Sequence, residues 1–173
     1  MDQNPPRILE SPAGDFYLRQ LTMRDAGEYY DVFDANRTHI AQYDRDFAHI
    51  FPTITAVTKE LAPFNAVQRR HFAIMQDGVF AGSIGMHLRQ PGVAELFYWI
   101  DQQHIGQNLA ARAGDIVVDD AFSYGYIDEM RAVIAETNQA SQRVAQKMGF
   151  TLLRKVYDEM HFSLQSTNST SIE

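Results

Sequence analysis

Cysteine is absent from this chain of 173 residues, and tryptophan occurs only once. The absence of cysteine excludes disulfide bonds, thiolate metal ligands and a cysteine nucleophile. No apolar run is long enough to cross a membrane, and no basic segment followed by an apolar stretch resembles a signal peptide. We therefore expect a cytoplasmic protein without a membrane partner.

Positive charge is also sparse, because 15 Lys and Arg are outnumbered by 22 Asp and Glu, which gives a net charge of −7. This balance argues against a nucleic-acid partner, since broad nucleic-acid binding needs a basic face. An acidic surface attracts cationic substrates such as amines. The 6 histidines, at positions 39, 49, 71, 87, 104 and 161, show no His-x-x-x-His or similar spacing, so we predict no metal site.

Hydrophobic periodicity divides residues 15–165 into the elements of a single domain. Strands are predicted at 16–21, 71–75, 79–88, 93–100, 131–135, 151–156 and 159–164. Helices are predicted at 26–33, 53–70, 106–124 and 138–148, the second of them broken or bent near Pro63. This order predicts an α/β fold of the α+β type, with a central mixed, mostly antiparallel β-sheet flanked by helices on both faces.

The remaining segments carry turn and loop signals. Residues 1–14 hold three prolines and predict a flexible N-terminal arm, and the polar residues 166–173 predict a disordered tail. Asp77-Gly78 predicts a tight turn between two strands. Residues 36–52 have no clean period and are expected to form a loop over a pocket.

The unit at residues 93–124 organises the rest of the chain. A short apolar and aromatic strand carries one carboxylate, Glu95, and a polar loop leads into an amphipathic helix with Gly106 at its entrance. The free N–H groups at a helix N-terminus form an anion site, and glycine lets a ligand approach the backbone closely. We hypothesise that this loop holds the pyrophosphate of a nucleotide-like cofactor.

Three stretches carry a resemblance to a known family: Ala94-Glu95-Leu96-Phe97-Tyr98-Trp99-Ile100, His104-Ile105-Gly106-Gln107-Asn108-Leu109-Ala110 and Asn138-Gln139-Ala140-Ser141-Gln142-Arg143-Val144-Ala145-Gln146-Lys147-Met148-Gly149-Phe150. Together with the order of elements, they resemble the GNAT superfamily of acyl-CoA-dependent N-acyltransferases, and within it the ribosomal-protein N-terminal acetyltransferase branch. The resemblance extends from about Phe16 to Leu164. It implies that residues 15–165 form one N-acetyltransferase domain.

The resemblance implies that a primary amine attacks the thioester of acetyl-CoA directly, without a covalent enzyme intermediate. The acceptor is then a protein N-terminus or a small-molecule amine, acetyl-CoA is the co-substrate, and a homodimer is left open. The implied cofactor-binding residues are Tyr98, Trp99, Ile100, Ile105, Gly106, Gln107, Asn108, Leu109, Ala110, Asn138 and Ser141.

The cofactor loop departs from the family pattern of Arg or Gln, two residues, Gly, one residue, then Gly or Ala. Ile105 stands at the basic position and Asn108 at the first of these glycines. Asn tolerates unusual backbone angles, so the loop shape is expected to survive. The alternative is a non-catalytic or weakly CoA-binding interaction protein on a GNAT scaffold, with a degenerate pyrophosphate loop. Phe97 also replaces a frequent Gly and is expected to narrow the acyl or acceptor pocket.

Two residues are catalytic candidates. In a regular strand Glu95 shares a face with Phe97 and Trp99, where desolvation would raise its pKa and suit a general base. The alternative is a structural carboxylate at the sheet edge. By the resemblance, Ser141 lies near the CoA sulfur and donates to the departing thiolate; the alternative is an ordinary first-turn serine.

Other polar residues have weaker assignments. Asn138 is expected to contact the pantetheine arm, and it also suits a plain helix N-cap. Tyr157 stands where some GNAT members have an acidic tyrosine, although we favour a packing role. His39, Tyr43 and His49 are candidates for lining the acceptor pocket, with a solvated loop as the alternative.

Overall fold

The computed structural model describes residues 7–62, 69–125 and 127–167. Its strands are β1 (Ile8–Glu10), β2 (Tyr17–Gln20), β3 (Arg69–Gln76), β4 (Val79–Gln90), β5 (Gly92–Ile100), β6 (Ile127–Ala135), β7 (Thr151–Val156) and β8 (Glu159–Gln165). Its α-helices are α1 (Ala26–Ile40), α2 (Ile54–Glu60), α3 (Leu109–Ser123) and α4 (Gln139–Lys147). Short 3₁₀ helices are η1 (Met23–Asp25), η2 (Phe47–His49) and η4 (Gln102–His104).

The strands form one 8-stranded sheet in the order β1-β2-β3-β4-β5-β6-β8-β7. Every neighbouring pair is antiparallel except β5 and β6, which run parallel. A parallel pair needs a crossover connection, and α3 supplies it. The predicted mixed, mostly antiparallel sheet is therefore confirmed.

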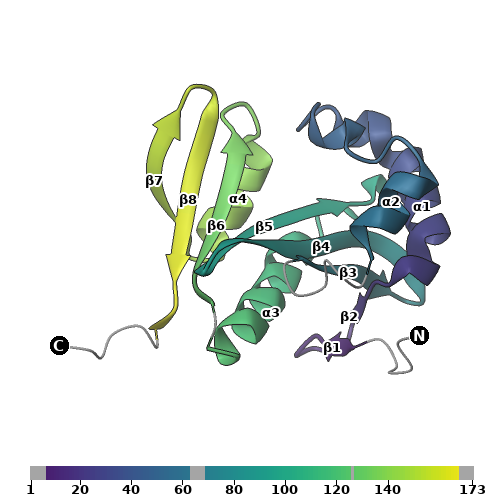
Figure 1. Cartoon of the computed structure of the whole chain (residues 1–173), viewed down its shortest axis with the longest axis horizontal. Coiled ribbons are helices and arrows are strands. Elements are labelled where there is room, and N and C mark those ends of the chain that lie inside the picture. Colours follow the sequence, from purple (N-terminus) through teal and green to yellow (C-terminus); the bar gives the residue numbers. More distant parts are fainter. Residues whose placement is uncertain (1–6, 63–68, 126, 168–173) are drawn as a thin grey trace.

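Helices cover both faces of the sheet, as Figure 1 shows. Alternation along β3 divides the core: Phe72 and Ile74 pack with α3 and α4, whereas Ala73 and Met75 pack with α1 and α2. Aromatic side chains dominate the second cluster, including Tyr29 and Phe33 of α1. Flanking helices on both faces, as predicted, leave the sheet ends as the places where a site can open.

Local sequence signals fix several element ends. Thr22 and Asp25 form a capping box at the entrance to η1 and α1. Asp77 and Gly78 both have positive φ and make the tight turn between β3 and β4 that the sequence predicts. Gly149 follows α4 with φ +84°, and the Phe150 N–H donates to Ala145 O in a Schellman motif.

Several predictions about element bounds are wrong in part. The segment expected to be a loose arm contains β1, because Ile8–Glu10 pairs with β2 and Arg7 forms an ion pair with Asp120 of α3. Helix α1 continues to Ile40, beyond the predicted end at Phe33, so the expected loop at 36–52 begins as helix. Asn36 is buried there, donates to Val32 O and accepts from the Gln102 N–H, which satisfies its polar atoms.

The helix predicted at 53–70 is also shorter. Helix α2 ends at Glu60, and Arg69 and Arg70 already belong to β3, where they pair with His87 and Met86. The predicted break at Pro63 lies outside the described residues. Of the predicted tail, the described residue Ser166 is buried and its N–H donates to Asp128 O.

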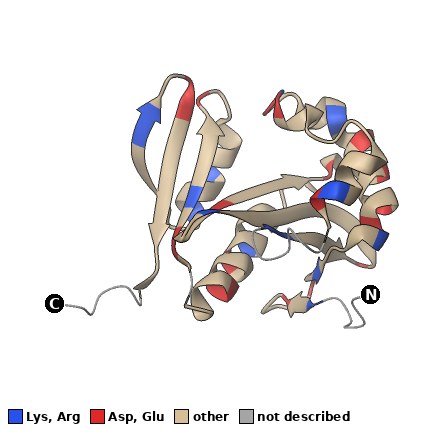
Figure 2. Cartoon of the chain, viewed as in Figure 1, with Lys and Arg blue, Asp and Glu red and all other residues tan. Residues whose placement is uncertain are grey.

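Charge is distributed over several elements. Figure 2 shows that acidic and basic residues are mixed along the helices and along the strands in that view.

Among the described residues, no helix is long and apolar enough to span a membrane.

Candidate functional site

The sheet opens between β5 and β6. Their parallel pairing begins at Gly92 and Ile127 and ends at Glu95 and Arg131, whereas β6 continues to pair with β8 as far as Ala135. Beyond Glu95, β5 stays with β4 and separates from β6, which is visible in Figure 1 as two diverging strands. The backbone of 96–100 therefore presents unpaired groups towards the opening, where an extended ligand can pair with them.

A cavity of about 590 Å³ occupies this opening. It runs between the separated strands, the N-terminal end of α3, one side of α4 and the end of α1. The sequence-predicted site residues that line it are Glu95, Tyr98, Trp99, Ile100, Ile105, Gly106, Asn108, Leu109, Ala110, Asn138 and Ser141. Such a volume is ordinary for a small-molecule or cofactor pocket.

Gln107 is the one predicted cofactor residue that does not line the cavity. Its side-chain oxygen accepts a hydrogen bond of 3.0 Å from Gln76 at the end of β3. The side chain therefore ties the loop to the sheet, which sequence spacing alone does not reveal.

The loop before α3 keeps an open backbone shape. Asn108 adopts the left-handed conformation with φ 59°, and Gly106 has φ +81°. The Asn108 side chain makes no capping hydrogen bond to the first turn of α3, and Leu109 and Ala110 of that turn line the cavity. The free N–H groups of a helix N-terminus therefore lie next to the cavity. The expectation that Asn tolerates the unusual angle is confirmed, and the arrangement suits an anion.

A cation lies beside this loop. Lys147, at the end of α4, lines the cavity and donates a hydrogen bond of 3.1 Å to the side-chain oxygen of Asn108. Arg143, one turn earlier on α4, also lines the cavity. Neither residue was predicted to belong to the site, although the stretch Asn138 to Phe150 that carries the family resemblance contains both of them.

The N-terminal turn of α4 brings three predicted residues together. Asn138 is buried and its Oδ1 accepts the Ser141 N–H at 3.0 Å, so the N-cap role is confirmed. Tyr98, on β5, faces this turn: burial raises its pKa to about 12, and the Ser141 side chain acts in the opposite direction. A neutral phenol and a serine hydroxyl therefore lie close to each other in the cavity wall.

Glu95 lies at the last paired position of β5 and β6. The expected shared face is confirmed, because Ala94 and Leu96 pack in the α3–α4 cluster and Trp99 packs in the α1–α2 cluster. The Glu95 carboxylate accepts two hydrogen bonds of 2.9 Å from Arg89 of β4. This bidentate pair fixes the orientation of the Glu95 carboxylate at the cavity edge.

Phe97 fills space next to Glu95 on the same face. Its ring lies 4.7 Å from the His71 ring and 4.6 Å from the His87 ring, and it packs over Gly85 of β4. Phe97 also lines the cavity, and the expected narrowing of the acyl or acceptor pocket stays a prediction.

The far end of the cavity lies against α1 and the segment after it. His39 and Tyr43 line this end, as predicted for an acceptor pocket, and their rings make an edge contact at 5.2 Å. His49, the third predicted residue, is exposed and is not part of the lining. Asp44 and Phe47 take part instead, and no local sequence signal distinguishes them from other loop residues.

The packing role favoured for Tyr157 is wrong. Tyr157 lies in the tight turn between β7 and β8 with φ 54°, and it is 93% exposed. A turn residue at the tip of a hairpin has few neighbours, so it neither packs against the core nor reaches the cavity.

Comparison of the sequence with known proteins identifies a family that it matches. The sequence matches the family described as "Acetyltransferase (GNAT) domain" over residues 15–151. It is 25% identical over 143 residues to "Probable N-acetyltransferase YjcK" of Bacillus subtilis (strain 168), which covers 78% of this chain and 79% of that protein.

Two solved structures illustrate the shared architecture. The RimL ribosomal L7/L12 alpha-N-protein acetyltransferase in complex with coenzyme A has a TM-score of 0.81 at 17% identity, covering 92% of this chain and 98% of that chain. The structure of AAC(6')-Ib in complex with ribostamycin and coenzyme A has a TM-score of 0.74 at 18% identity. The match covers 91% of this chain and 99% of that chain. At such identities these likenesses show the fold alone.

Proposed function

The chain belongs to the acetyltransferase (GNAT) family, and on that premise we propose that its acceptor is a primary amine of a protein N-terminus or of a small molecule. Family membership makes it an acetyl-CoA-dependent N-acetyltransferase. The observation that carries the proposal is the cavity at the separation of β5 and β6, because it joins an anion-binding end to an aromatic and acidic end.

The cofactor occupies the end of the cavity at α3 and α4. The pyrophosphate binds the N–H groups of the α3 N-terminus near Gly106 and Asn108, with Lys147 as its cation. Lys147 thereby takes the part of the basic residue that Ile105 replaces. The pantetheine arm runs along the unpaired edge of 96–100 and contacts Asn138.

The reaction needs a proton acceptor for the amine and a proton donor for the thiolate. Glu95 is the general base, and an incoming ammonium replaces Arg89 as the partner of one carboxylate oxygen. Ser141 donates to the departing sulfur, next to the neutral Tyr98 hydroxyl. Backbone N–H groups of the opened part of β5 stabilise the charge that develops on the thioester oxygen.

The acceptor end explains a preference for amines. His39, Tyr43 and Asp44 line it together with Glu95, so aromatic faces and carboxylates surround the space from which an ammonium would enter. Among the structural neighbours, one is a ribosomal L7/L12 alpha-N-protein acetyltransferase and another is in complex with ribostamycin and coenzyme A. The same chemistry therefore accommodates either class here.

The proposal is tested by following CoA release from acetyl-CoA with three acceptor sets: peptides with free or blocked N-termini, polyamines and aminoglycosides. We expect turnover with at least one free amine and none with blocked peptides. Glu95→Gln is expected to lower kcat by roughly 10²-fold or more with unchanged acetyl-CoA affinity. The exposed carboxylate variant Glu159→Gln serves as the matched control.

Two outcomes would contradict the proposal. The first is the absence of transfer to any of these amines at saturating acetyl-CoA. The second is calorimetry that detects no acetyl-CoA binding at millimolar ligand, which would favour the interaction-protein alternative.

A further inference from the structure

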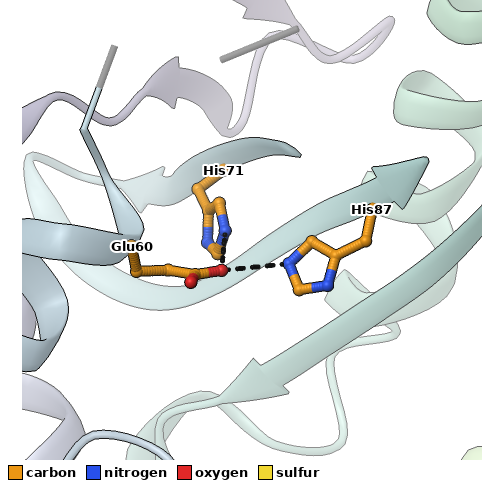
Figure 3. A group of neighbouring side chains, drawn as sticks. All are labelled: Glu60, His71 and His87. Carbon is orange, nitrogen blue, oxygen red and sulfur yellow. Dashed lines mark hydrogen bonds and ion pairs between the residues drawn. The ribbon is translucent and has the colours of Figure 1, made fainter. Parts of the chain in front are cut away.

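Glu60, His71 and His87 meet on the α1–α2 face of the sheet, as Figure 3 shows. Glu60 is the last residue of α2, and the two histidines belong to the neighbouring strands β3 and β4. Glu60 Oε1 lies 3.0 Å from His71 Nε2 and 3.1 Å from His87 Nε2. Both imidazoles therefore direct one nitrogen at the same carboxylate oxygen.

These distances match the edges of a metal coordination shell. In a tetrahedral zinc site with bonds of about 2.0–2.1 Å, neighbouring ligand atoms are about 3.3 Å apart. The three ligand atoms of this cluster all lie within 4.8 Å of one another. We propose that Glu60, His71 and His87 coordinate a divalent metal ion, and that this ion is Zn²⁺.

The donor set favours zinc over harder cations. Two imidazole nitrogens and one carboxylate oxygen are typical zinc ligands, whereas Ca²⁺ and Mg²⁺ prefer oxygen atoms throughout. Three protein ligands leave a fourth position for water.

Neighbouring residues hold the side chains of the three ligands in place. Arg69 pairs with Oε2 of Glu60, which orients the carboxylate and leaves Oε1 directed at the histidines. The His71 side chain is only 3% exposed, so the protein rather than solvent fixes the position of its imidazole. The Phe97 ring packs on both imidazoles and restricts their rotation.

The site is separate from the cavity described above. None of its three ligands is among the lining residues, and Phe97 lies between the two places. A bound ion would link the C-terminal end of α2 to β3 and β4 and thus act on stability. The earlier expectation of no metal rested on local His spacing, which does not detect ligands that come from three different elements.

The test uses the full chain without an affinity tag, stripped of metal with a chelator and titrated with ZnCl₂ by calorimetry. We expect one Zn²⁺ per chain with micromolar or tighter affinity, and a rise in Tm on binding. Glu60→Gln and His87→Gln should each weaken binding by roughly ten-fold or more. His161→Gln is the matched control, since His161 lies 3.4 Å from Glu159 on β8, away from the cluster.

Cobalt gives a second, spectroscopic readout of the same site. We expect Co²⁺ to produce the intense visible absorption of a tetrahedral site in the wild-type chain and to lose it in His87→Gln, whose folding is checked by circular dichroism. The proposal is overturned by absent binding, by weak octahedral absorption only, or by binding that His161→Gln removes and His87→Gln does not. In those cases the cluster binds no metal, and the Glu60 carboxylate only accepts hydrogen bonds from the two imidazoles.

Discussion

Lys147, near the end of α4, donates a hydrogen bond of 3.1 Å to the side-chain oxygen of Asn108, the residue that precedes α3. The contact joins two elements across the mouth of the cavity. It holds the Asn108 side chain against α4 while the backbone of Asn108 keeps a left-handed conformation. An asparagine at a position where the family has glycine is thus accommodated by its surroundings.

Substitution of Asn108 separates an adapted loop from a degraded one. Asn108→Gly keeps the backbone conformation, so we expect acetyl-CoA affinity to change by less than about three-fold. Asn108→Val should lower the free energy of unfolding by about 1–2 kcal/mol, because a β-branched residue resists this conformation. Calorimetry and urea unfolding measure the two effects. Binding that becomes at least about ten-fold tighter in Asn108→Gly would indicate a degraded loop.

Removal of the cation at the loop should weaken cofactor binding. We expect Lys147→Gln to raise the Kd for acetyl-CoA by roughly ten-fold at low salt, since a charge-assisted contact to phosphate is lost. The difference from wild type should shrink as salt increases. Lys155→Gln is the control, because Lys155 pairs with Glu136 and does not line the cavity. Equal effects of both substitutions would argue against a specific phosphate contact.

Tyr98 should shape the stability of the protein at alkaline pH. Burial raises its pKa from 10.0 to about 12, so the unfolded chain releases this proton first as pH rises. The stabilisation is fully present below pH 10 and is lost as pH rises from 10 towards about 12, a change on the order of 2 kcal/mol. Tyr98→Phe should therefore lose less stability over this range than wild type. Urea unfolding at a series of pH values measures the loss, with Tyr157→Phe, at a 93% exposed position, as the control.

Gly85 of β4 lies where the backbone of β3 and the ring of Phe97 leave no room for a side chain. A Cβ atom there would lie closer than 3.0 Å to the Arg70 carbonyl oxygen and to the Phe97 ring. We expect Gly85→Ala to reduce the free energy of unfolding by about 3 kcal/mol, because backbone cannot move aside as a flexible side chain can. Gly27→Ala, in open space on α1, should instead raise it by about 0.5 kcal/mol. Similar effects of the two substitutions, measured by urea unfolding, would contradict this account of the packing.

Much of the fold follows from short-range sequence signals. The hairpins at Asp77-Gly78 and at 151–164, the helix from Leu109 and the end of α4 at Gly149 were all predictable, because turn chemistry and periodicity act within a few residues. Most predicted cofactor residues line the cavity for the same reason, since one strand-loop-helix unit carries nearly all of them. The errors occur where tertiary contacts override local pattern: β1 is ordered by β2 and α3, and α1 is extended by buried Asn36.

The sequence by itself determined the family and the order of helices and strands from which the mixed sheet was predicted, because motifs and hydrophobic periodicity lie in contiguous residues. Only the tertiary structure decided which side chains face one another across the elements. The pairs Arg89–Glu95 and Lys147–Asn108 and the cluster of Glu60 with two histidines each depend on strand register or helix docking. Those contacts arise from packing between elements, so no spacing along the chain specifies them in advance.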